Sequence, residues 1–455
     1  MIKKNNKRYE LWQKGYNIDD EVFKFTVGKD QVYDLKYARQ DILGSIAHAA
    51  GLKKIGVLTA SEFSKLKKEL AGLYKQVGQG KFVIPETDED VHTTVENHVT
   101  KKYGSLGKKM HTGRSRNDQC IVDQHLYAKD KVLDILYHTL ESAKIFYEFA
   151  KKYEMIPMPG YTHMQRAMPA SVGMWMGSFL ESLIDNIKIL KCAYEINDQS
   201  ALGSAAGFGV GLNLDREYTA KLMGFKKVQK NSMYVAAGRG MIDSNVIYAY
   251  SCIMNTYAKL AGDILMFTMA EFKYFQLPDK FCTGSSIMPQ KKNGDVFELV
   301  RAKSKIMFGL LVTEMGLYMN TPSGYNRDSQ LSKEPMMESS ELMENTAKII
   351  NLTIPGLEPI EENLRKAFSP DIYATDYALE LVKQGMPFRD AYRKVANEID
   401  KLESRDPDKN IRSKTHIGAT GNLQLNKSLA EIRQHQAWLK KEKTNFDNAI
   451  KKLLS

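Results

Sequence analysis

The feature that most constrains the fold is a long stretch without helix breakers: neither glycine nor proline occurs from Arg114 to Ile156. Within this stretch apolar residues recur at steps of three, four or seven, which marks one face of an amphipathic helix. These residues are Leu126, Leu133, Leu136, Leu140, Ala143 and Tyr147. Because a helix cannot bury such a face alone, the stretch predicts further helices packed against it.

Four other ranges have a helical pattern. We expect long helices around 179–194, between 241 and 275, from about 295 to 318, and from about 336 to 350. The alternation of apolar and polar residues that marks a strand is hard to find. The sequence therefore predicts an all-α fold, with a central helical bundle domain at 112–362 between smaller helical domains at 1–111 and 363–455.

Composition excludes several classes of protein. Of the 455 residues, 43% are hydrophobic and 26% are charged, which is typical of a soluble globular protein. No run approaches 18 consecutive apolar residues, so we expect no membrane span, and the first residues lack the apolar core of a secretory signal. The four cysteines are scattered without a C-x-x-C pair. This pattern favours reduced thiols in a cytoplasm over disulfides or a zinc site.

The formal net charge of +11 allows two interpretations. A basic chain can bind nucleic acid, or it can present a dispersed basic surface that attracts small anionic substrates. The lysine pairs lie along the whole chain, and no aromatic-rich RNA-binding motif accompanies them. The second interpretation is therefore favoured, and we expect no nucleic-acid partner.

Four polar, turn-rich segments interrupt the helical pattern: KKMHTGRSRNDQ (108–119), PGYTHMQRAMP (159–169), GSSIMPQKKN (284–293) and YNRDSQLSKE (325–334). In helical bundles, pockets form where loops and helix ends meet. These segments are therefore the candidates for chemistry.

The first segment precedes the longest predicted helix and has two interpretations. Asn117 or Asp118 can cap that helix while Arg114 and Arg116 are surface charges. Alternatively, Arg116 with its neighbours at the helix start forms a site for a carboxylate or a phosphate.

The second segment places His163 between two prolines, beside Thr162 and Gln165. Such a histidine can be structural, or it can act as a general acid or base, because its side chain titrates near neutral pH.

The third segment can be a mobile loop with solvated lysines. It can also hold a serine base whose pKa is lowered by Lys291 and by backbone N–H groups aimed at its oxygen. There is no G-x-S-x-G elbow, so an acyl-enzyme hydrolase is not favoured.

Two further segments fail as cofactor motifs. The glycine-rich GSAAGFGVG (203–211) lacks the G-x-G-x-x-G spacing and follows a helical pattern, so we expect no dinucleotide. HTTVENH (92–98) lacks the H-E-x-x-H spacing, so we expect no metal.

Together the four segments resemble the fumarase/aspartase superfamily and, within it, the argininosuccinate lyase family. GSSIMPQKKN is similar to the signature loop of the superfamily, and the other three are similar to motifs of the lyase family, in the same order. The similarity extends to QDILGSIAHA (40–49), DEDVHTTVE (88–96) and LVKQGMPFRDA (381–391). It implies an all-α subunit, a homotetramer with active sites built from three chains, and the conversion of argininosuccinate to arginine and fumarate.

The resemblance also implies roles for individual residues. The proton transfers would be made by Ser285 and His163, with Glu298 orienting the imidazole and Lys291 supplying charge; which of the pair is the acid stays open, and we favour Ser285 as the base. The succinyl carboxylates would be faced by Ser115, Arg116, Asn117, Thr162, Lys291 and Asn293. The arginine end would be held by Tyr325, Gln330 and Lys333.

Some positions depart from the family pattern. Asp30 stands where the family usually has a serine that touches substrate. In NSMYVAAGRG (231–240), Tyr234, Gly238 and Gly240 replace three acids, and only Arg239 is kept. The contacts to the arginine moiety are therefore the open part of the assignment. The alternatives are another lyase of the superfamily, of the adenylosuccinate lyase or aspartase type, and a non-catalytic structural relative.

Overall fold

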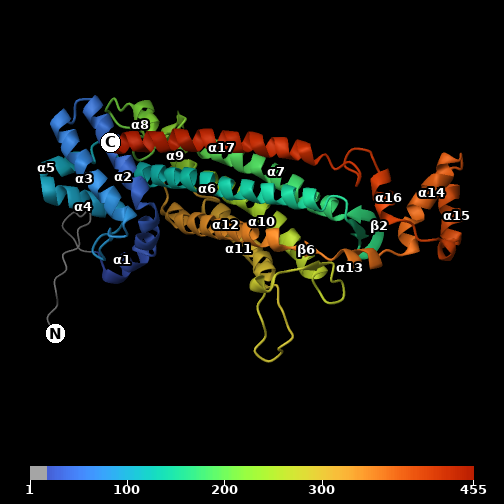
Figure 1. The fold of residues 1–455 in the computed structure, drawn as a ribbon. Coiled ribbons are helices and arrows are strands. Elements are labelled where there is room, and N and C mark those ends of the chain that lie inside the picture. The colour runs from blue at the N-terminus through green and yellow to red at the C-terminus, as the bar shows by residue number, and fades with distance from the viewer. Residues whose placement is uncertain (1–17) are drawn as a thin grey trace.

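The computed structural model describes residues 18–455. Figure 1 shows an elongated molecule in which long helices run side by side, with α1–α5 at one end and α13–α16 at the other. The expectation that no secretory signal is present concerns residues 1–17, which lie outside the described residues.

The amino-terminal end consists of α1 (Asp20–Val27), α2 (Asp30–Lys54), α3 (Ala60–Gly78), α4 (Val91–Tyr103) and α5 (Ser105–Lys109). Side chains that satisfy free backbone N–H groups fix where these helices begin. Asp90, for example, accepts the N–H of Thr93 at 2.8 Å and so starts α4. Because α4 begins there, the residues just before it face the start of the central bundle.

The central bundle confirms the five expected long helices. They are α6 (Arg116–Lys152), α7 (Val172–Asn197), α10 (Met241–Phe267), α11 (Asp295–Leu317) and α12 (Lys333–Thr353). Most of their apolar side chains join one continuous core. The all-α prediction is therefore correct.

Shorter helices connect and extend the bundle. These are α8 (Arg216–Leu222), α9 (Ser232–Ala237), α13 (Glu361–Lys366), α14 (Ala374–Lys383), α15 (Phe388–Asn397) and α16 (Pro407–Ser413). Single 3₁₀ turns are η1 (Asp279–Phe281), η2 (Arg327–Ser332), η3 (Ile354–Gly356), η4 (Pro370–Tyr373) and η5 (Ile399–Lys401).

The last helix, α17 (Leu425–Leu454), returns along the bundle and packs against α6 and α7 (Figure 1). Its buried side chains, such as Ile432 and Phe446, belong to the same core as the bundle. The domain boundaries inferred from sequence stay a prediction, and the return of α17 ties the last predicted domain to the central one.

In the part of the chain that the structure describes, six short strands form three two-stranded sheets. β1 (Pro157–Thr162) and β2 (Gln165–Ser171) are an antiparallel hairpin, with an irregular register between Pro159 and Tyr161. The other pairs are β3 (Gln199–Ser200) with β4 (Lys227–Val228), and β5 (Phe275–Gln276) with β6 (Glu358–Pro359). The hairpin follows the carboxyl end of α6. Among residues 18–455, no helix is long and apolar enough to cross a membrane.

Candidate functional site

A polar cavity of about 220 Å³ lies at the amino end of α6. Its walls come from the start of α2, the segment before α4, the first turns of α6, the segment before α10, and η2 with the start of α12. The lining residues are Asp30, Glu89, Asp90, Arg116, Asn117, Cys120, Arg239, Tyr325, Arg327, Gln330 and Lys333.

This cavity brings together two of the four polar segments singled out in the sequence. Five predicted substrate residues line it: Arg116, Asn117, Tyr325, Gln330 and Lys333. The other lining residues were not predicted from the sequence as part of the site. Asp30 and Arg239 were named only in the segments where the sequence differs from the family pattern. For Glu89 and Asp90, the only available signal was the similarity of the segment DEDVHTTVE.

The start of α6 is fixed by a capping box. Ser115 Oγ accepts the N–H of Asn117 at 3.3 Å, and Asp118 Oδ1 accepts the N–H of Ser115 at 2.8 Å. We predicted from the sequence that Asn117 or Asp118 caps this helix. The cap residue is instead Ser115, and Asp118 takes part as the second member of the capping box. The backbone bonds leave the Asn117 side chain free to line the cavity.

The glycine-rich segment 203–211 has a structural role beside this cap. The second oxygen of Asp118 accepts the N–H groups of Gly203 at 2.8 Å and Ala205 at 3.1 Å. Burial nevertheless raises the pKa of Asp118 to about 6. The segment thus surrounds a buried carboxyl group at the start of α6.

Arg116 is held by acids of the same chain. Its Nη1 lies 2.7 Å from Glu89, its Nε lies 2.9 Å from Asp90, and its Nη2 donates to Thr93 at 3.1 Å. Burial alone would lower the pKa of Arg116, but Asp90 and Glu89 raise it above its ordinary value. Glu89 also pairs with Arg327 at 3.1 Å. Within one chain the Arg116 charge is therefore neutralised, and its predicted contact with a substrate carboxylate stays a prediction.

Lys333 lies at the floor of the cavity against two carboxylates. Its Nζ is 2.6 Å from Asp34 and 3.2 Å from Asp30, and the side chain is buried. Burial, opposed by Lys333, raises the pKa of Asp30 to about 6. Asp30, which stands where the family usually has a serine, therefore directly changes the surroundings of Lys333, a predicted substrate-binding residue.

Gln330 and Tyr325 complete the predicted arginine end. Gln330 donates to the carbonyl oxygen of Thr26 at 2.8 Å and accepts from Arg327 at 2.9 Å. Tyr325 lines the same cavity, and burial raises the pKa of its phenol. The structure thus places all three predicted residues of the arginine end in one pocket.

The segment 231–240, where the sequence lacks the usual acids, borders the cavity through Arg239. Gly240 has φ 82°, and a Cβ at this position would lie 2.5 Å from a ring carbon of Tyr318. Glycine is therefore required there. Tyr234 lies in the exposed part of α9 and is not among the lining residues.

His163 lies at the exposed tip of the β1–β2 hairpin, as does Thr162. The two residues between the paired strands, His163 and Met164, have φ 50° and 61°. Positive φ at both positions is the geometry that usually takes Asn-Gly in a hairpin turn, so two larger residues are strained here. Strain of this kind clusters at functional sites, and the role of His163 stays a prediction.

The loop 283–293 is closed by a pair of backbone hydrogen bonds between Thr283 and Asn293, at 3.0 and 2.9 Å. Inside it, Ser285 Oγ accepts the N–H groups of Ile287 at 3.3 Å and Met288 at 3.1 Å. Two donated N–H groups favour negative charge on this oxygen, and the role of Ser285 as a base stays a prediction.

The remaining predicted residues of this region are accessible. Lys291 and Glu298 are exposed, and Asn293 donates its side-chain N–H to the carbonyl oxygen of Gly284 at 3.3 Å. Within residues 18–455, no hydrogen bond or ion pair joins His163 to Ser285 or to Glu298. The expected orientation of His163 by Glu298 is therefore not made within one chain.

The hairpin is far from the cavity. Arg116 begins α6, and the hairpin follows its other end. The 37 residues of α6 span about 55 Å at a rise of 1.5 Å per residue. One chain therefore cannot place His163 in its own cavity.

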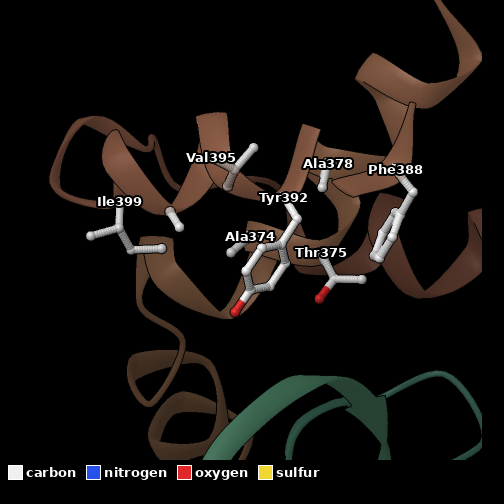
Figure 2. Close-up of a pocket in the computed structure, with 8 residues that line it drawn as sticks. Ala374, Thr375, Ala378, Phe388, Tyr392, Val395 and Ile399 are labelled. Atoms are coloured by element: carbon white, nitrogen blue, oxygen red, sulfur yellow. The ribbon is translucent and has the colours of Figure 1, made fainter. Parts of the chain in front are cut away.

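A second cavity, of about 190 Å³, lies between α14 and α15 (Figure 2). Apolar side chains such as Phe388 and Val395 line most of it, and Figure 2 shows the Tyr392 hydroxyl and the Thr375 hydroxyl as its polar groups. It lacks the convergent charged groups of the first cavity, so it is not the candidate site.

One group of metal-ligating residue types occurs within residues 18–455. Ligand atoms of Asp41, His92 and Asp123 lie within 4.8 Å of one another. His92 Nδ1 is 2.7 Å from Asp41, which is a hydrogen-bond distance, and its Nε2 is 3.0 Å from the sulfur of Cys120. Both ring nitrogens are thus engaged by protein atoms, and we assign no metal to this group.

Comparisons with known proteins agree with these motifs. A family model described as "Lyase" matches residues 19–309. Argininosuccinate lyase of Sorangium cellulosum is 39% identical over 425 residues, which cover 93% of this chain and 99% of that protein. Argininosuccinate lyase of Phocaeicola vulgatus is 41% identical over 418 residues, which cover 91% of this chain and 92% of that protein.

Solved structures extend the comparison to the fold. EDDS lyase in complex with formate matches with a TM-score of 0.82 and 21% identity, over 96% of this chain and 95% of that one. A class II fumarase from Schistosoma mansoni matches with a TM-score of 0.68 and 16% identity, over 87% and 96%. At these identities the matches establish a shared all-α architecture.

Proposed function

The chain belongs to the argininosuccinate lyase family of lyases, and from this premise we propose that it releases fumarate from argininosuccinate and leaves arginine. The observation that carries the proposal is the cavity at the start of α6. It gathers Asn117, Tyr325, Gln330 and Lys333, the residues that the family resemblance relates to substrate, in one pocket.

Ser285 and His163 supply the proton transfers in this proposal. Ser285 removes the proton from the carbon next to a carboxylate, which forms a dianionic aci-carboxylate. The carbon–nitrogen bond then breaks, and His163 gives a proton to the leaving guanidinium nitrogen. The two N–H groups donated to Ser285 Oγ support its assignment as the base, because they favour the deprotonated oxygen.

We propose further that the enzyme is a homotetramer and that each active site uses several chains. The separation of about 55 Å along α6 supports this proposal, because His163 could contribute to such a cavity only on another copy. A surface for that copy is available on α11. An apolar stripe remains exposed there, formed by Phe308, Val312 and Met315 at steps of four and three, and the exposed Met319 lies just beyond the end of the helix. This spacing is the one that helices use to pack against each other.

The remaining parts of the proposal concern the cofactor requirement and the cellular location of the enzyme. The reaction uses side chains and backbone donors alone, so we expect turnover without added metal or cofactor. All four cysteines are free, which agrees with a cytoplasmic location.

The proposed function is tested by the absorbance of released fumarate. Purified protein is offered argininosuccinate, adenylosuccinate and aspartate at equal concentration, with and without a metal chelator. We expect the fastest turnover with argininosuccinate and no effect of the chelator. Faster turnover of either other substrate would move the chain to another lyase reaction, and no turnover of any would favour a non-catalytic relative.

A further inference from the structure

The cavity at the start of α6 contains a group that the proposed reaction does not use. Cys120 lines this cavity, and its sulfur lies 3.0 Å from His92 Nε2. His92 Nδ1 lies in turn 2.7 Å from Asp41. All three side chains are buried. A thiol, an imidazole and a carboxylate in this order are the arrangement that activates cysteine nucleophiles.

The charges that face the Cys120 sulfur are mainly positive. Burial alone would raise the pKa of Cys120, but the charge and hydrogen bond of His92, with the charges of Lys333 and Arg239, hold it below its ordinary value. The pKa of His92 is correspondingly well above its ordinary value, because Cys120 and Asp41 outweigh its burial. The cations near the sulfur are His92, Arg116, Arg239 and Lys333. The acidic groups nearby, which counteract the effect of these cations on the thiol, are Asp41, Asp123, Tyr37 and Tyr325.

Arg239 gives the same cavity a cation with unused hydrogen-bond donors. It is only 4% exposed, and its Nε and Nη2 have no hydrogen-bond partner among residues 18–455. The buried carboxyl groups of Asp243 and Glu314 interact with its charge, but they give no hydrogen bond to these two nitrogens. Buried N–H groups without an acceptor are costly, and an anion that enters the cavity can satisfy them. Because Arg239 lines the cavity beside Cys120, an anionic group that enters the cavity finds a cation and a nucleophile together.

We propose that Cys120 is a nucleophilic thiolate in this cavity, and that small carboxylate-bearing electrophiles are drawn to Arg239, alkylate the sulfur and stop turnover. With an α-halo carboxylate, the sulfur attacks the carbon that carries the halogen. The carbon–sulfur bond forms, the carbon–halogen bond breaks, and the halide leaves with the bonding pair. No proton is transferred. The adduct then occupies the cavity of about 220 Å³.

The alkylation itself does not depend on the proposed lyase reaction, whereas the loss of turnover rests on it. The two halves are therefore measured separately. Peptide mass spectrometry measures labelling at each cysteine, and fumarate absorbance measures turnover in the same samples.

The labelling test treats the wild-type protein with iodoacetate or with iodoacetamide, its neutral counterpart, at pH 8 and pH 6. The exposed Cys192 is the internal reference. The labelling rate of an ordinary thiol falls roughly 80-fold between these pH values. We expect the Cys120 rate to fall by a clearly smaller factor than that of Cys192. We also expect the ratio of iodoacetate to iodoacetamide labelling to be at least tenfold higher at Cys120 than at Cys192.

Variants test the parts of the arrangement. His92→Asn should restore an ordinary pH dependence at Cys120, and Arg239→Met should remove the preference for iodoacetate. A Cys120 rate that falls in parallel with that of Cys192 in the wild-type protein would overturn the thiolate. An equal ratio of iodoacetate to iodoacetamide labelling at Cys120 and Cys192 would overturn the role of Arg239. Both wild-type measurements stand even where a variant does not fold.

The turnover half is tested by the extent of inactivation. Loss of turnover should follow labelling of Cys120 one to one. Cys120→Val protein should keep whatever turnover it has under iodoacetate, and Cys192→Ser protein should stay as sensitive as the wild type. Full labelling of Cys120 with unchanged turnover would overturn the claim of inactivation while leaving the reactive thiol in place. Absence of turnover before treatment would instead contradict the proposed function.

Discussion

The cavity at the start of α6 and the loops that carry His163 and Ser285 differ in how complete they are within one chain. Around the cavity, Lys333 and Arg116 are ion-paired to acids of the same chain. At the loops the neighbouring apolar side chains are bare: Met164 is 72% exposed and Ile287 is 84% exposed. Large apolar side chains left in water beside proposed catalytic residues indicate surfaces that another copy covers. This difference supports our proposal that one chain builds the binding half of a site and presents the proton-transfer half to neighbouring copies.

The largest expected effect comes from the loop. Ser285→Ala should lower turnover by about 10³- to 10⁴-fold with little change in KM, because its oxygen acts only in the transition state. The matched control is Ser286→Ala, on the adjacent serine, which should lose less than about tenfold. Both values come from fumarate absorbance over a range of argininosuccinate concentrations. Similar losses in the two variants would mean that the loop acts only as a cover.

The next effect concerns the surface that joins the copies. Phe308→Glu introduces a charge into the apolar stripe of α11, at a side chain that is 61% exposed in one chain. We expect smaller oligomers by sedimentation and a loss of turnover of about 100-fold or more, since the proton-transfer groups no longer reach the cavity.

The control for this substitution is Leu379→Glu, at another exposed apolar position, on α14, where the side chain is 43% exposed. It should leave both assembly and turnover as they are. A fully active monomer of Phe308→Glu would contradict the division of the site between chains.

Sequence reasoning was most reliable where the signal is local. The absence of glycine and proline from 114 to 156, with apolar residues at helical steps, predicted α6 almost to its ends. The hairpin was seen only as a polar, turn-rich segment. Its usual signal is Asn-Gly, and the chain has His163 and Met164 in the strained positions instead.

Contacts between distant residues could not be predicted in this way. Lys333 pairs with Asp34, which lies 299 positions earlier, and His92 meets Cys120 across 28 positions. No local pattern records such pairs, because packing of α2, α4, α6 and α12 creates them. The family resemblance supplied Lys333, but the role of Cys120 and the two Arg239 nitrogens without a hydrogen bond emerged only from the structure.

A smaller expected effect tests how the charge of Asp30 influences substrate binding in the cavity. Asp30 lies 3.2 Å from Lys333 and opposes a carboxylate that approaches this lysine. Asp30→Ser should therefore lower the KM for argininosuccinate by up to about tenfold at pH 8, where the wild-type carboxyl is ionised. With its pKa raised to about 6, Asp30 is mostly neutral at pH 5, so the two proteins should then have similar KM values.

Asp30→Asn is the matched neutral control, and it should follow Asp30→Ser at both pH values. A KM that rises in both variants at pH 8 but not at pH 5 would show instead that the ionised carboxylate helps to bind the substrate.

The smallest expected effect concerns the stability of the hairpin that carries His163. His163→Asn/Met164→Gly replaces two strained residues by the pair that this turn prefers. We expect the free energy of unfolding to increase by about 1 kcal/mol while turnover is nearly abolished. Urea denaturation at one fixed protein concentration measures the first quantity. A destabilised double variant would mean that the hairpin tip is not strained.

The most direct test of the divided site is complementation between two inactive proteins. His163→Asn lacks the hairpin imidazole but keeps the cavity, and Tyr325→Ala/Gln330→Ala lacks cavity residues but keeps the hairpin. The two are denatured together in equal amounts, refolded, and checked for the oligomeric state of the wild type. If each site takes its cavity and its hairpin from different chains, about a quarter of the wild-type activity should return, because each intact half is present with even probability. A refolded oligomer of the correct size without activity would show that cavity and hairpin act from the same chain.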